Sequence, residues 1–137
     1  MHDKKYVLMS IKPVYAEMIK TGQKTIELRR IAPKVTAGDV LVIYESSPVK
    51  RVTAFCEIEA IVVTEPNELW ENASDIAGVN RDSFVKYFEG KTQAVGIKLG
   101  EVQIISAPKE LGSISTDMQA PQSYRYLSKE QFRTLAE

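Results

Sequence analysis

Cysteine and histidine are nearly missing from this sequence of 137 residues, which contains only Cys56 and His2. Structural zinc sites need several Cys or His ligands, and the common nucleophilic triads pair a serine or cysteine with a histidine. His2 lies in a terminus that we expect to be frayed, and Cys56 lies in an apolar, strand-like run where it is interpreted as a small core residue. The sequence therefore predicts no metal site and no histidine-dependent catalysis.

Long apolar runs and glycine-rich phosphate loops are also missing. The N-terminal segment MHDKKYVLMSIKP contains only a short apolar stretch, far from a signal-peptide core or the roughly 20 apolar residues that cross a bilayer. Neither the dinucleotide-binding nor the P-loop spacing of glycines occurs. We therefore expect a cytoplasmic protein that has no membrane partner and no nucleotide cofactor.

The composition is that of an ordinary globular chain, with 44% hydrophobic and 26% charged residues. This length fits one domain, over residues 1–137. The eighteen basic and eighteen acidic residues cancel, yet ten of the basic and only five of the acidic ones lie within residues 1–51. This asymmetry is compatible with a basic patch that faces an anionic ligand such as RNA, and equally with a solvated lysine-rich surface.

The hydrophobic pattern predicts mostly strands with a few short helices. A helix begins at Pro13 and ends at Gly22, and a last helix begins after Ser128, with Gln131 at the capping-box position. Residues 120–127 are expected to begin as a loop. Two further helices are predicted at 67–78 and 80–90, and the strands are predicted at 6–11, 25–30, 40–46, 51–66, 92–100 and 102–106.

This order favours an α+β fold. Strand-helix-strand alternation, which a parallel doubly wound sheet requires throughout, occurs only once in the chain. A small mixed barrel or a partly open sheet fits the many strands and tight turns better.

The stretch TGQKTIELRR, residues 21–30, carries the most suggestive chemistry. Its alternation places Ile26 and Leu28 on one strand face and Glu27 and Arg29 on the other, with Lys24 at the corner between helix and strand. A lysine beside a carboxylate can act as a general base, and an arginine can bind a phosphate through two parallel hydrogen bonds. A solvent-exposed charged strand face is the alternative interpretation.

The same stretch resembles the signature of the ASCH domains in the PUA-like superfamily, Gly-x-Lys-x-x-Glu-x-Arg. Gly22, Lys24, Glu27 and Arg29 match every specified position, and the strand and helix before them and AGDVLVIYES after them also resemble the family. The resemblance covers residues 1–65 and the predicted strand at 93–100. It implies a single ASCH domain, folded as a PUA-like β-pseudobarrel of about five or six strands with flanking short helices. It also implies a cleft lined by Lys24, Glu27 and Arg29.

Other polar or aromatic residues stand at the ends of predicted elements, where the rim of a pocket is usually built. An ordinary surface loop explains the segment APQSYRYL equally well. The candidate ligand-binding residues added on this basis are Lys12, Arg30, Ser46, Ser47, Gln122, Ser123 and Tyr124.

The resemblance implies RNA or a nucleotide-like small molecule as the partner, and a regulatory role in translation or transcription. Basic residues would contact phosphates, and tyrosines would stack on bases. The basic candidates are Lys24, Arg29, Arg30, Lys50 and Arg51, and the stacking candidates are Tyr44, Tyr124 and Tyr126.

A hydrolase is the alternative function, and the sequence leaves open whether the protein is an enzyme. Some ASCH-like proteins deacetylate acetylcytidine nucleosides with a lysine and a threonine nucleophile. Lys24 matches that lysine, but Glu27 stands at the nucleophile position and Thr25 is displaced by two residues. A water activated by Glu27, with Lys24 and Arg29 stabilising the oxyanion, would be needed instead. A ribonuclease that uses Lys24 and Glu27 is a further possibility, and we expect binding rather than catalysis.

Overall fold

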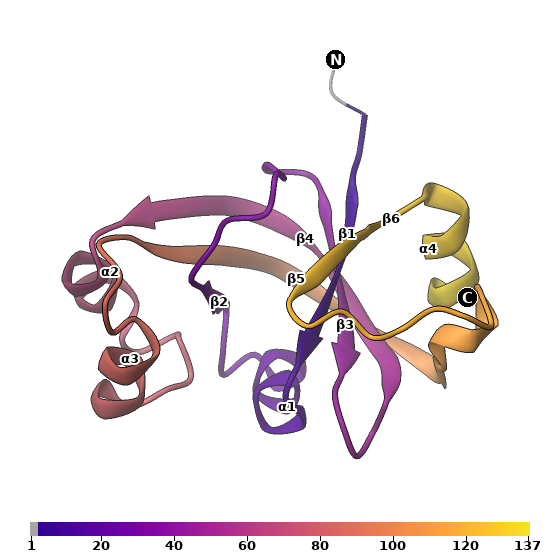
Figure 1. The fold of residues 1–137 in the computed structure, drawn as a ribbon, viewed down its shortest axis with the longest axis horizontal. Coiled ribbons are helices and arrows are strands. Elements are labelled where there is room, and N and C mark those ends of the chain that lie inside the picture. The colour runs from indigo at the N-terminus through magenta and orange to yellow at the C-terminus, as the bar shows by residue number, and fades with distance from the viewer. Residues whose placement is uncertain (1–2) are drawn as a thin grey trace.

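The computed structural model describes residues 3–137, and His2, with its expected frayed terminus, lies outside the described residues. Six strands, four helices and one 3₁₀ turn follow one another (Figure 1). In chain order they are β1 Tyr6–Ile11, α1 Pro13–Thr21, β2 Ile26–Arg29, β3 Val40–Glu45, β4 Arg51–Thr64, α2 Pro66–Ala73, α3 Arg81–Tyr87, β5 Ala94–Lys109, η1 Leu111–Ser113, β6 Tyr124–Leu127 and α4 Lys129–Ala136.

The strands form one mixed sheet in the order β2-β5-β4-β3-β1-β6. The pair β1 and β3 is parallel, and the other neighbouring strands are antiparallel. The sheet is not closed, because β2 and β6 are its two ends. Figure 1 shows β4 and β5 as a long curved ribbon, with α2 and α3 at one end of the molecule and α4 at the other. The predicted α+β class and the number of strands are confirmed.

Two segments differ from the sequence prediction. Residues 94–109 form one continuous strand instead of two, because Gly100 is not a turn. A Cβ atom there would lie only 3.1 Å from the Glu57 carbonyl oxygen, so Gly100 allows β4 and β5 to approach closely. The expected loop before the last helix contains β6, whose four residues pair with β1 from Met9 back to Tyr6.

The predicted bounds of the first helix and the predicted start of the last helix are confirmed, whereas the two middle helices end before Gly78 and Gly90, at Ala73 and Tyr87. Pro13 is the first residue of α1, and Gly22 follows the helix in the left-handed region with φ +86°. The Ser128 hydroxyl accepts a hydrogen bond from the Gln131 amide at 3.0 Å, and the Gln131 side chain accepts one from the Ser128 amide at 2.9 Å. These two bonds form the capping box that begins α4.

Both faces of β1 are buried, in two different clusters. Val7 and Met9 pack with Ile19 of α1 in one cluster, and Tyr6 and Leu8 belong to a second cluster that includes residues of α4. A third cluster lies under α2 and α3, where Ile26 and Leu28 of β2 meet Leu69, Phe84 and Phe88. The third cluster holds the apolar face of β2 against α2 and α3, so the opposite face of β2 points towards α1.

An ion pair fastens the C-terminal end of α1 to the sheet. Lys20 Nζ lies 2.6 Å from Glu45 Oε2, and the Thr53 hydroxyl donates to the same oxygen at 2.6 Å. Partial burial by itself would lower the pKa of Lys20, but Glu45 and Glu17 outweigh it and raise that pKa. The pair fixes the orientation of α1, whose first turn contributes to the site described next.

None of the helices within residues 3–137 is both long and apolar enough to cross a membrane.

Candidate functional site

A cavity of about 540 Å³ lies between β2, the first turn of α1, α3 and residues 122–123. This volume is within the range of about 300–1,000 Å³ that is typical of small-molecule sites. Apolar side chains from β2 and α3 form part of its wall, and hydroxyl groups of serines and tyrosines form another part. The charged residues that line it are Lys12, Lys24, Glu27, Arg29 and Arg30.

Glu27 lies at the centre of a buried group of three charges. Arg29 reaches its Oε2 atom with Nη2 at 2.9 Å and with Nε at 3.1 Å. Lys24 Nζ lies 3.6 Å from the other carboxylate oxygen, Oε1. The side chains of all three residues are close to nine-tenths buried or more. The interpretation of this face as a solvent-exposed charged strand is therefore wrong.

Lys24 is held in place mainly by backbone groups. Its own amide donates to the Met18 carbonyl at 3.1 Å, and its Nζ donates to the Ala77 carbonyl. Gly78 packs against the lysine chain so closely that a Cβ atom would lie 3.1 Å from Lys24 Cδ. Burial lowers the pKa of the Lys24 ammonium, and the attraction of Glu27 opposes this only in part. The result is a fixed amine that loses its proton more readily than an ordinary lysine.

Arg29 connects the two ends of the open sheet. Its Nη2 donates to the Ser10 carbonyl of β1 at 3.0 Å, and its Nη1 donates to the Ser123 hydroxyl, just before β6, at 3.3 Å. The Ser10 hydroxyl in turn donates to the Pro121 carbonyl at 2.6 Å. The guanidinium of β2 thus bridges to β1 and β6 on the side where the strands themselves do not pair.

Arg30 and Tyr87 lie together in the cavity wall. Arg30 Nε donates to the Tyr87 carbonyl at 2.8 Å, and its guanidinium carbon lies 4.4 Å from the centre of the Tyr87 ring. The Tyr87 hydroxyl donates to the Leu28 carbonyl at 3.3 Å, which ties α3 to β2. Burial raises the pKa of this phenol.

The structure brings together most of the candidate residues from the sequence, but not all of them. Thr25 is exposed and lines a separate depression beside Gly100. Ser46 and Ser47 lie in the turn between β3 and β4 and do not line the cavity. The candidates that line it are Lys12, Lys24, Glu27, Arg29, Arg30, Gln122 and Ser123.

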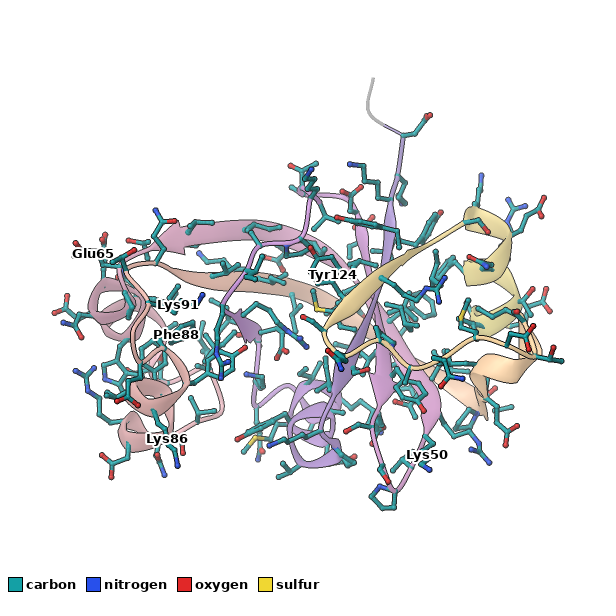
Figure 2. The ribbon with its side chains drawn as sticks, viewed as in Figure 1. Lys50, Glu65, Lys86, Phe88, Lys91 and Tyr124 are labelled. Atoms are coloured by element: carbon teal, nitrogen blue, oxygen red, sulfur yellow. The ribbon has the colours of Figure 1, made fainter. Side chains whose placement is uncertain are left out.

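The aromatic and basic residues proposed from the sequence are more scattered. Tyr44 is buried in the cluster that includes residues of α4, and the Tyr126 hydroxyl accepts a hydrogen bond from the Lys34 amide at 2.8 Å. Tyr124 pairs with Met9 in the sheet and does not line the cavity. Figure 2 shows Lys50 beside the turn between β3 and β4, away from Tyr124.

Sequence reasoning missed several residues of the cavity wall. Ser10 is the one polar residue in the apolar run YVLMSI, which is a signal that could have identified it. Tyr15 has the spacing of an apolar helix stripe with Met18 and Ile19, but the centre of its ring lies 5.6 Å from Lys24 Nζ. Ser83 and Tyr87 come from α3, and no pattern in the sequence connects that helix to residues 24–29.

A family model, a curated relative and a crystal structure indicate the same family. The family model of the ASCH domain matches residues 9–112. An ASCH domain-containing ribonuclease from Zymomonas mobilis is 34% identical over 135 residues, which are 97% of this chain and 91% of that protein. A crystal structure of ASCH from Zymomonas mobilis has a TM-score of 0.91 at 34% identity and covers 97% of this chain and 94% of that chain. The N-terminal domain of Staphylothermus marinus McrB, with a TM-score of 0.62 and 10% identity over 98% of this chain and 94% of its own, shares the fold alone.

Proposed function

Because this chain belongs to the ASCH domain family, we propose that it binds single-stranded RNA and that one unpaired nucleotide enters the cavity. The observation that carries this proposal is the charge of the wall: four cationic side chains line the cavity against one carboxylate. A phosphate-bearing ligand is attracted by such a wall. The ribonuclease name of the Zymomonas mobilis relative supports RNA as the ligand.

The cations other than Arg30 divide into two kinds. Lys24 and Arg29 are buried and already neutralised in part by Glu27. Lys12 is exposed at the N-cap of α1, and its ammonium forms no hydrogen bond or ion pair with the described residues. We propose that Lys12 contacts a phosphate of the RNA. Lys24, Glu27 and Arg29 then contact the polar edge of the nucleotide in the cavity.

Single-stranded RNA fits the site better than a duplex. The paired bases of an A-form helix cannot enter a cavity of this size, whereas an unpaired nucleotide can turn out of the strand and do so. The apolar and tyrosine side chains of the wall suit a base, and the serine hydroxyls offer hydrogen bonds to its edge.

The binding proposal is tested by fluorescence anisotropy with a short single-stranded RNA and its duplex, at about 50 and 200 mM salt. We expect the single strand to bind more tightly, with an affinity that falls as salt rises. Lys12→Gln should lower the slope of log Kd against log salt by about 0.7, the value of one phosphate contact on a single strand. Lys129→Gln, at the start of α4 and outside the cavity, is the matched control and should change nothing. No binding at low salt would overturn the proposal.

RNA cleavage is the second candidate, and the lowered pKa of Lys24 favours it. The neutral amine of Lys24 would accept the proton of a ribose 2′-hydroxyl, whose oxygen then attacks the adjacent phosphorus. The bond from phosphorus to the 5′-oxygen breaks, a water supplies the proton to that oxygen, and a 2′,3′-cyclic phosphate remains; the proton on Lys24 then neutralises the hydroxide that the water leaves. Arg29 would stabilise the charge on the phosphoryl oxygens.

Cleavage is tested with RNA and the same strand lacking 2′-hydroxyl groups. We expect the wild-type protein to cleave the RNA and not the strand that lacks 2′-hydroxyl groups. Lys24→Met should abolish cleavage, and the control Lys129→Gln should cleave like the wild type. If Lys24→Met cleaves RNA as fast as the wild type, Lys24 has no role in the reaction. Release of acetate from acetylcytidine would favour the amidohydrolase alternative. In that mechanism Glu27 must activate a water, although Lys24 and Arg29 already form ion pairs with its carboxylate.

A further inference from the structure

Arg30 is exposed but is not a freely moving surface charge. Its Nε donates to the Tyr87 carbonyl at 2.8 Å, and its guanidinium lies over the Tyr87 ring at 4.4 Å. An exposed arginine gains little from a single surface contact, because ordering its long side chain costs conformational entropy. Two contacts to the same residue fix the guanidinium before any ligand arrives.

The Tyr87 ring beneath Arg30 is itself anchored to the rest of the fold. The Tyr87 hydroxyl donates to the Leu28 carbonyl at 3.3 Å, and the Tyr87 and Phe88 rings pack edge to face with 4.8 Å between ring centres. Phe88 belongs to the buried cluster under α2 and α3. The guanidinium therefore rests on a ring that is anchored to β2 and to the core.

An exposed apolar residue lies next to this pair in the sequence. Ile31 is 67% exposed, the highest value among the large hydrophobic residues of residues 3–137, and it also lines the cavity. The wall at Arg30, Tyr87 and Ile31 thus combines a cationic plane with open apolar surface. Nucleic-acid bases stack on arginine planes as well as on aromatic rings.

We propose that Arg30, held on Tyr87, is a stacking site for the base of the nucleotide next to the one in the cavity. This inference rests on the proposed RNA function and specifies its ligand as single-stranded RNA of two or more nucleotides. It gives Arg30 a base contact in place of the phosphate contact expected from the sequence. The Tyr87 ring covers one face of the guanidinium and the Tyr87 carbonyl binds its Nε, so the opposite face is available to a base.

The test separates stacking from charge. A short RNA is compared with the same strand in which one neighbouring nucleotide lacks its base. Wild-type protein should bind the intact strand about tenfold more tightly, which is within the range measured for one stacked base. Arg30→Lys keeps the charge but removes the plane, so it should bring this ratio close to one.

Arg81→Lys is the matched control. Arg81 also lies over an aromatic ring, that of Trp70 at 5.4 Å, but it does not line the cavity, so its variant should keep the wild-type ratio. The fluorescent base 2-aminopurine at the neighbouring position should be quenched by the wild type and not by Arg30→Lys. An unchanged ratio in Arg30→Lys would overturn the stacking site while leaving RNA binding intact. Failure of the wild type to bind either strand would instead overturn the proposed function.

Discussion

Replacement of Arg29 by alanine should be among the most damaging single changes in this protein. The change removes both contacts to Glu27 Oε2, at 2.9 and 3.1 Å, and the hydrogen bonds to Ser10 and Ser123. Glu27 would then keep only Lys24, at 3.6 Å, as a charged partner. The variant therefore leaves a buried carboxylate poorly compensated and breaks the bridge between the ends of the sheet.

The expected loss of unfolding free energy is about 3–5 kcal/mol, the usual cost of removing one partner from a buried ion pair. Solvent screening reduces this value little, since the side chains of Arg29 and Glu27 are 11% and 9% exposed. The unfolding free energy of a typical domain is about 5–15 kcal/mol in total. The variant should therefore fold but unfold at a much lower denaturant concentration.

The assay is urea unfolding of wild type, Arg29→Ala, Glu27→Gln and the double variant. If the uncompensated carboxylate causes the loss, the double variant should be more stable than the sum of the single changes implies, with a coupling of about 1–3 kcal/mol. Arg125→Ala, on an exposed position of β6, is the control and should cost less than about 0.5 kcal/mol. A loss below about 1 kcal/mol for Arg29→Ala, or strictly additive single changes, would refute the reasoning.

Burial lowers the pKa of Lys24 from its ordinary value of 10.5. Between the lowered pKa and 10.5, the unfolded chain therefore binds more protons at this residue than the folded chain does. Lys24 thus makes the unfolding free energy of the wild type rise with pH up to about 10.5. Lys24→Met should lack this rise in denaturant unfolding at neutral and alkaline pH, and equal slopes for the two proteins would contradict the assignment. Gly78→Ala and Gly90→Ala place alanine at φ +72° and +79°, so each should lower the unfolding free energy by about 1 kcal/mol or more. Of the two glycines, only Gly78 contacts Lys24. RNA affinity should therefore fall in Gly78→Ala alone, and an equal fall in both would show that backbone strain causes it. Burial raises the pKa of Cys56 to about 12, so a thiol reagent at mildly alkaline pH should modify it only after unfolding, and rapid modification of the folded protein would be the opposite result.

The central part of the site could be predicted from the sequence because it is local. Lys24, Glu27 and Arg29 lie within six consecutive residues, and the period of a strand places the last two on one face. The helix boundaries at Pro13 and Gly22 are equally readable, because proline at the first helical position has its φ preset and needs no N–H there, and Gly22 adopts a left-handed conformation that few other residues adopt easily.

The rest of the cavity could not be predicted, for a physical reason. Lys24, Arg29 and Arg30 are positioned by the carbonyl oxygens of Ala77, Ser10 and Tyr87. Every residue has such an oxygen, so no side-chain pattern reveals which one will lie at the site. The partners are also distant along the chain, 53 residues away for Ala77 and 57 for Tyr87.

The short strand β6 was missed for a related reason. Its residues YRYL are partly exposed, and only Leu127 is buried, so the segment has no clear alternation. Pairing with β1 makes it a strand, and that pairing also brings Ser123 to Arg29. A prediction from local pattern alone therefore places residues 120–127 in a loop.

The location of bound RNA on the protein is the most direct test of the central claim. Backbone amide chemical shifts would be followed by NMR while a short single-stranded RNA is added. The largest changes should occur at the cavity, around Lys12, Arg30 and Ser123. Largest changes around Glu57 and Glu101, which line a separate depression, would contradict the account.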